Sequence, residues 1–131
     1  MAEKIMNHRD LDVYVRASEC AMTIFRLSKK FPEEETYSLT DQIRRSSRSV
    51  CSNIAEGWRR RRHEMAFIDK LSVAEGEAAE TQVWLEFAVE CEYIPAEEAR
   101  ELYKTYAGII GTLVGMINNV DKWILHPKKP A

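Results

Sequence analysis

The chain has 131 residues, of which 45% are hydrophobic and 31% charged, and its formal net charge is −2. One domain of this length and composition can bury a substantial core, which excludes a disordered chain. The net charge is too small to indicate nucleic-acid binding by the whole surface. We therefore expect a single domain over residues 1–131, with loose ends at 1–10 and 127–131.

The first ten residues lack the apolar core of a signal peptide, and no apolar run approaches the roughly 18 residues of a membrane span. A cytoplasmic protein is therefore expected. The cysteines Cys20, Cys51 and Cys91 have neither C-x-x-C spacing nor a nearby pair of histidines, which argues against a disulfide framework and a zinc site. We expect reduced, half-buried cysteines and no metal or other cofactor.

The first predicted helix covers residues 12–31. Apolar residues recur in alternating steps of four and three, which is the spacing of one buried helix face. These residues are Val13, Ala17, Cys20, Ile24, Leu27 and Phe31. Asp12 suits the first turn, where the helix dipole favours an anion, and Pro32 ends the helix.

The second predicted helix begins near Ser38 or Thr40. Ser38 and Asp41 have the spacing of a capping box, with Asp41 in the place of the usual Glu or Gln. The apolar face of this helix carries Leu39, Ile43, Val50 and Ile54. We expect the helix to end at Gly57, because glycine readily adopts the left-handed conformation of a C-terminal cap.

The third predicted helix covers residues 63–93, and the fourth covers residues 96–125. The third has a seam in steps of four and three: Phe67, Leu71, Ala74, Ala78, Thr81, Leu85 and Ala88. The fourth has a seam of the same period: Leu102, Tyr106, Ile109, Leu113, Met116, Val120 and Trp123. Gly108, Gly111 and Gly115 each cost the fourth helix about 1 kcal/mol relative to alanine, so we expect another helix to approach closely there.

Four helices with seams of this period and short connections predict an all-α, antiparallel up-down-up-down four-helix bundle. The apolar surface is wider than the seams require, because further apolar residues lie beside the third and fourth seams. These residues are Trp84, Phe87, Ile110, Val114 and Ile117. We interpret them as an oligomer interface. The alternative is a broader bundle core.

Charge is distributed unevenly along the chain. Segment 39–62 has seven arginines against two acids, a local charge of +5, whereas segment 64–98 has ten acids against one lysine, a local charge of −9. The arginines are Arg44, Arg45, Arg48, Arg59, Arg60, Arg61 and Arg62. One interpretation is a surface that contacts the phosphates of RNA or DNA, with Trp58 either stacking on a base or packing in the core or an interface. The other is a solvated face, or salt bridges to the acidic third helix of the same or a neighbouring subunit.

No combination of residues indicates catalysis. Asn53, Glu56 and Gly57 lack a second titrating group at a suitable spacing, so capping and hydrogen bonds between helices explain them better. The histidines are scattered, and Cys51 has no histidine partner. We expect neither an enzyme nor a small-molecule substrate.

The segment 39–57 also carries a family resemblance. It reads L-x-x-Q-I-R-R-S-x-x-S-V-x-x-N-I-A-E-G, and it follows L-x-V-Y-x-x-A at residues 11–17. The chain resembles the four-helix-bundle family named after proteins encoded in intervening sequences of bacterial 23S ribosomal RNA genes. It departs from the family pattern in the third helix, where Ala74 and Glu75 replace the usual Gly-Ser pair.

This resemblance implies a homopentameric ring of bundles without known catalysis. It also implies a relationship to the accessory variability determinant of diversity-generating retroelements, which works with a reverse transcriptase and nucleic acid. We therefore consider two hypotheses. The first is a homo-oligomeric binding and assembly module that contacts RNA or DNA through the arginine-rich end of the second helix. The second is an oligomeric scaffold that interacts only with proteins. Neither involves a membrane.

Overall fold

The computed structural model describes residues 4–126, and every regular element within them is a helix. Four long helices are joined by short connections: α1 (Asp12–Ser28), α2 (Leu39–Arg59), α3 (Glu64–Glu90) and α4 (Ala96–Asn118). Three short 3-10 helices accompany them: η1 (His8–Asp10), η2 (Glu33–Glu35) and η3 (Val120–Lys122). Of the ends expected to be loose, 1–3 and 127–131 lie outside the described residues, and residues 8–10 form η1.

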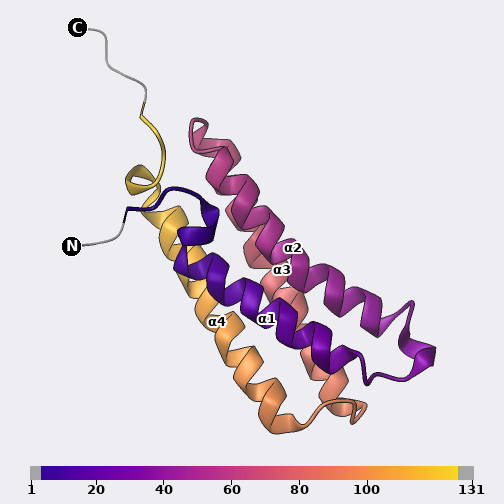
Figure 1. Cartoon of the computed structure of the whole chain (residues 1–131). Helices are drawn as coiled ribbons and strands as arrows, with labels where there is room; N and C mark the ends of the chain where they lie inside the picture. The colour runs from indigo at the N-terminus through magenta and orange to yellow at the C-terminus, as the bar shows by residue number, and fades with distance from the viewer. Residues whose placement is uncertain (1–3, 127–131) are drawn as a thin grey trace, which may run out of the picture.

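The four long helices lie side by side in one bundle (Figure 1). Contacts run from α1 to α2, from α2 to α3, from α3 to α4 and from α4 back to α1, so the helices enclose a common core. The predicted all-α, four-helix fold is confirmed. None of the helices within residues 4–126 combines the length and the apolar character that crossing a membrane requires.

The predicted seams supply most of the bundle core, whereas three of their members, Leu27, Val120 and Trp123, are half-buried against it. In α3 all seven seam residues are buried, from Phe67 to Ala88. α4 ends before the predicted boundary at 125, because the chain tightens into η3 after Asn119. The Gly115 carbonyl oxygen accepts hydrogen bonds from both the backbone amide (3.0 Å) and the side-chain amide (2.8 Å) of Asn119, so one residue closes the last turn of α4.

The start of α2 is capped differently from the predicted box of Ser38 and Asp41. The Ser38 side chain makes no capping bond. Instead Glu35 of η2 accepts hydrogen bonds from the Ser38 hydroxyl (2.6 Å) and from the Leu39 amide (3.2 Å). Bonds from Ser38, Tyr93 and Leu39 favour the charged carboxylate and lower the pKa of Glu35. A carboxylate from the preceding connection therefore supplies the anion at the start of α2.

Gly57 lies inside α2, so the predicted left-handed C-terminal cap is wrong. α2 continues to Arg59, and no glycine within residues 4–126 has a positive φ. A Cβ atom at position 57 would lie 3.2 Å from Leu71 Cδ2 and 3.3 Å from Lys70 Cβ. The glycine therefore serves the close packing of α2 against α3.

We expect Gly57→Leu to lower the free energy of unfolding by about 1–3 kcal/mol, because the added atoms would force α2 and α3 apart. Gly76→Leu on α3 is the matched control, since a Cβ atom there would meet nothing within 4 Å. The free energy of unfolding of this control should rise by about 0.5–1 kcal/mol, because leucine favours the helix more than glycine does. Urea denaturation followed by circular dichroism measures both variants, and equal effects would contradict the packing role of Gly57.

Candidate functional site

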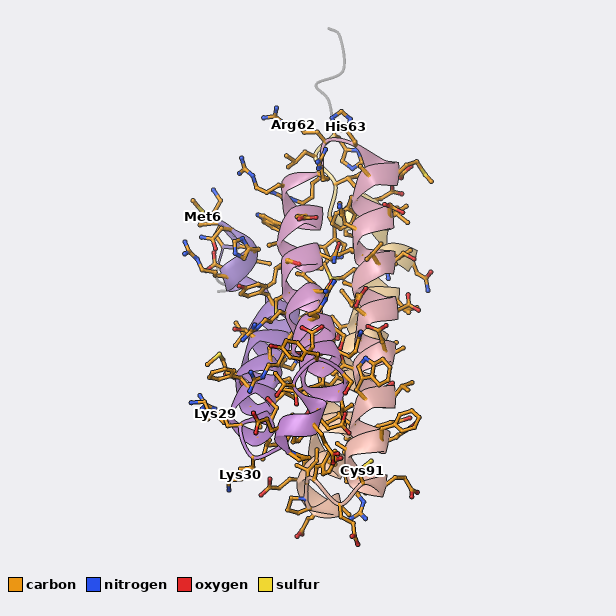
Figure 2. The ribbon with its side chains drawn as sticks, turned by 90° about the vertical axis from the view of Figure 1, so that its right-hand side faces the viewer. Met6, Lys29, Lys30, Arg62, His63 and Cys91 are labelled. Atoms are coloured by element: carbon orange, nitrogen blue, oxygen red, sulfur yellow. The ribbon has the colours of Figure 1, made fainter. Side chains whose placement is uncertain are left out.

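The seven arginines separate into two groups in the structure. The α2 arginines, on the first half of α2, are Arg44, Arg45 and Arg48. The tip arginines, at the turn between α2 and α3, are Arg59, Arg60, Arg61 and Arg62. Because eleven positions separate Arg48 from Arg59, the groups lie about 16 Å apart along the helix axis. Figure 2 shows the tip, marked by Arg62 and His63, at the end of the bundle opposite Cys91.

Two of the α2 arginines contact α1. Arg44 Nε donates to Ser28 Oγ (2.8 Å), and the Arg44 guanidinium lies 4.9 Å from the centre of the Phe25 ring. The Arg48 guanidinium lies 5.7 Å from the centre of the same ring. A cation–π contact contributes about 0.5–1 kcal/mol at an exposed site. The packing of α2 on α1 therefore accounts for both side chains.

Salt bridges within the chain do not account for the arginines. Within residues 4–126, ion pairs join Arg16 to Asp12 (2.9 Å) and Lys70 to Glu56 (2.8 Å). None of the seven arginines takes part in either pair. The described residues therefore do not form the predicted salt bridges between these arginines and α3 of the same chain. Bridges to a neighbouring subunit stay a prediction.

At the tip, Arg61 is anchored while the other three arginines are exposed. Arg61 Nε donates to the Trp58 carbonyl oxygen (2.8 Å), and its guanidinium lies 3.4 Å from the centre of the Trp58 ring. The Arg61 carbonyl oxygen accepts a hydrogen bond from the Leu125 amide (2.8 Å). The turn is thus fixed to α2 and to the segment after α4. Trp58 is only 6% exposed and belongs to the core, so the structure favours the packing role over stacking on a base.

The tip arginines surround a hollow of about 370 Å³. Its lining consists of Trp58, Arg59, Arg60, Arg61, Arg62, His63 and Leu125. No acidic side chain is among the described residues that line it. The nearby Glu56 carboxylate pairs with Lys70, and the charge of Arg60 also contributes to lowering its pKa. Partial burial, and then the charge of Arg59, lower the pKa of the Arg61 guanidinium. Both causes disfavour the charged guanidinium, and a bound anion would stabilise it.

The residues predicted for an oligomer interface have mixed exposure. Phe87 and Val114 are exposed, at 54% and 36%. Trp84, Ile110 and Ile117 are half-buried against the core, so a broader core accounts for part of the surplus apolar surface. Phe87 lines two hollows, one of about 600 Å³ between α3 and α4 and one of about 380 Å³ between α2 and α3.

Two exposed apolar residues on this surface fall outside the predicted set. They are Val83 (42% exposed) and Tyr103 (40% exposed), and Tyr103 lines the larger hollow. Helical spacing from Phe87 and from Val114 could have identified them. This part of α4 is open, because a Cβ atom at Gly111 would meet nothing within 4 Å. The close approach expected at Gly111 and Gly115 is therefore not made by the described residues of the same chain, whereas a Cβ atom at Gly108 would lie 3.2 Å from Arg16 Nη1 of α1.

Two of the three cysteines are placed for packing. Burial raises the pKa of the Cys20 and Cys51 thiols to about 11, so both stay protonated near neutral pH. Cys91 is exposed, in contrast to the half-buried position predicted.

The Asn53 side-chain amide donates to the Ser49 carbonyl oxygen (2.9 Å) within α2 and not to another helix, in contrast to the predicted hydrogen bond between helices. Among residues 4–126, no group of three or more His, Cys, Asp or Glu side chains is placed to hold a metal ion.

The fold and the tip define an all-α, four-helix protein with a concave basic end. Residues 9–115 match the family described as 23S rRNA-intervening sequence protein. Because this match spans most of the chain, the chain belongs to that family. The family resemblance of segment 39–57 is confirmed.

A crystal structure supports the same assignment. It is that of a protein of unknown function from the S23 ribosomal protein family of Bacteroides thetaiotaomicron. The two proteins share 32% sequence identity with a TM-score of 0.73, over 81% of this chain and 95% of that chain. No curated protein matches the sequence.

We expect Arg44→Ala to lower the free energy of unfolding by about 1–2 kcal/mol, because it removes the Ser28 hydrogen bond and the contact with Phe25. Arg45→Ala is the matched control, since it removes the same charge from an exposed position on the same helix. Its effect should stay within about 0.5 kcal/mol. Thermal and urea unfolding measure both variants. A loss in Arg45→Ala as large as that in Arg44→Ala would contradict the packing role of Arg44.

Proposed function

We propose that the protein is a non-enzymatic, homo-oligomeric binding module that contacts RNA through its tip arginines. One observation carries the proposal: Arg59, Arg60 and Arg62 are exposed around a hollow that no described acidic residue lines. Guanidinium groups pair with phosphate oxygens in bidentate geometry, and such contacts provide affinity with little base preference.

The antiparallel up-down-up-down topology forms part of this proposal. The Leu125–Arg61 hydrogen bond joins the segment after α4 to the turn between α2 and α3. The Tyr93 hydroxyl donates to Glu35 (2.9 Å), which joins the α3–α4 connection to the α1–α2 connection. The α1–α2 and α3–α4 connections thus meet at one end of the bundle, and the α2–α3 turn meets the segment after α4 at the other, as the proposed topology requires.

The homo-oligomer is proposed to form through the exposed apolar surface of α3 and α4. This surface combines the exposed side chains of Phe87, Val114, Val83 and Tyr103 with a hollow of about 600 Å³. An exposed apolar surface of this kind is typical of an interaction site. The family resemblance supports a ring of five copies.

The assembly is tested by the double variant Phe87→Glu with Val114→Glu. We expect a monomer, because the two charges would have to be desolvated in an apolar contact. Val15→Glu with Met22→Glu is the control, since both residues are exposed and apolar (40% and 47%) but lie on α1. Sedimentation velocity measures the mass and circular dichroism checks the fold. An oligomer that persists in the Phe87 and Val114 variant would refute this interface.

RNA binding is tested by replacing Arg59, Arg60 and Arg62 together with glutamine. The variant should bind single-stranded RNA at least about tenfold more weakly at about 50 mM salt. The slope of log affinity against log salt should fall by about 2, because each phosphate contact to a single strand contributes about 0.7. Fluorescence anisotropy at several salt concentrations measures both quantities.

The control for this experiment replaces Arg26, Lys30 and Lys104 with glutamine. These residues are exposed and lie outside the tip, and their loss changes the net charge equally. Their replacement should leave the slope nearly unchanged. If both triple variants lose the same slope, RNA responds only to overall charge and the tip is not the site.

The second candidate function is a protein scaffold without a nucleic-acid partner. It is supported by Arg44 and Arg48, whose guanidinium groups pack on Phe25, so these two arginines do not require a nucleic-acid partner. The tip arginines would then pair with the acidic α3 of a neighbouring subunit. In that case the glutamine variant at the tip loses its oligomeric mass. Loss of RNA binding with an unchanged mass favours the first function.

A further inference from the structure

The shape of the tip bears on which part of an RNA strand it holds. We propose that the hollow binds the terminal phosphate of a single-stranded RNA, a phosphomonoester, in preference to the diesters within the strand. This inference rests on the proposed RNA contact and specifies the ligand of the same site.

The first argument is the placement of the charge. A site that follows a strand along its backbone needs basic groups spaced along a groove. In this protein four arginines and one histidine occupy the consecutive residues 59–63, and all five line one hollow. The next arginine back along α2, Arg48, lies about 16 Å away and contacts Phe25. The positive charge is therefore concentrated in one place, which suits an RNA strand whose terminal phosphate is bound there.

The second argument is the charge of the ligand. A diester carries one negative charge, whereas a terminal phosphomonoester approaches two near neutral pH because its second pKa is about 6. The monoester also presents three terminal oxygens, which accept several charge-assisted hydrogen bonds at once. A hollow with several guanidinium groups and no acidic residue among its described lining matches that ligand better than a diester.

The third argument is the rigidity of the hollow. The Arg61 guanidinium is held by Trp58 and its carbonyl by Leu125, so the turn that presents the other arginines is fixed before a ligand arrives. The His63 side chain does not cap α3, so the first amides of this helix add positive potential at the same end. Glu64 lies in that first turn, but it is exposed and does not line the hollow.

The size of the hollow favours an end over a continuous strand. Its volume of about 370 Å³ is near the lower limit of ligand pockets, which occupy about 300–1,000 Å³. Such a space admits a phosphate and its sugar.

The test uses the full chain and one internally labelled RNA of about 12 nucleotides. The RNA is prepared with a 5′-phosphate, with a 3′-phosphate, and with hydroxyl groups at both ends. We expect at least one phosphorylated form to bind about tenfold more tightly than the unphosphorylated form at the same salt. In Arg60→Gln with Arg62→Gln this ratio should fall to about one, whereas in Arg26→Gln with Lys104→Gln it should be retained.

The outcomes separate this inference from the RNA contact on which it rests. Equal binding of all three RNAs overturns the inference and leaves the RNA contact in place. If none of the RNAs binds, both are overturned. If a nucleoside monophosphate binds as tightly as the phosphorylated RNA, the ligand is a free nucleotide, and the proposal that the hollow binds the end of an RNA strand is overturned. If polyglutamate displaces the phosphorylated RNA as effectively as unlabelled phosphorylated RNA does, the hollow binds any polyanion, including an acidic protein. That result also overturns the inference.

Discussion

Helix α2 meets α3 through small side chains, and this close approach determines where the large residues of α2 can go. At Gly57 a single added carbon would lie 3.2 Å from Leu71. Farther along the same contact, the buried Thr81 hydroxyl donates to the Ser46 hydroxyl (2.8 Å). Because this side of α2 packs against α3, the arginines of α2 lie on its other faces and at its C-terminal end. Arg44, on one of those faces, packs on α1.

The same contact concentrates positive charge at one end of the bundle. The turn between α2 and α3 has only residues 60–63, so four consecutive arginines share a small volume. Their repulsion opposes folding. Partial burial, and then the charge of Arg59, lower the pKa of Arg61. The stacking of Arg61 on Trp58 offsets part of this cost by holding one guanidinium in place. What results is a concave basic surface in which Arg61 is held in place and Arg59, Arg60 and Arg62 are exposed, which is a form that suits anion binding.

The periodic part of the fold could be predicted from the sequence, because burial repeats along a long helix. The seam of α3 is buried throughout, as its spacing indicates. Features that depend on a neighbouring helix could not be predicted. Gly57 suits a helix cap and a close contact equally well, and only the position of α3 decides between them. Likewise, nothing in local spacing shows that Arg44 would lie over Phe25, or that Trp58 would be covered by Arg61. The grouping of arginines at the tip was predictable, but the hollow between them was not.

Light scattering on the size-exclusion peak, with and without RNA at about 50 and 500 mM salt, tests the central claim most directly. The claim is that one oligomer presents a phosphate-binding tip. We expect a mass of about five times the 15.2 kDa of one chain, which increases with RNA at low salt and does not increase at high salt. A monomer, or an oligomer whose mass RNA leaves unchanged at low salt, would contradict it.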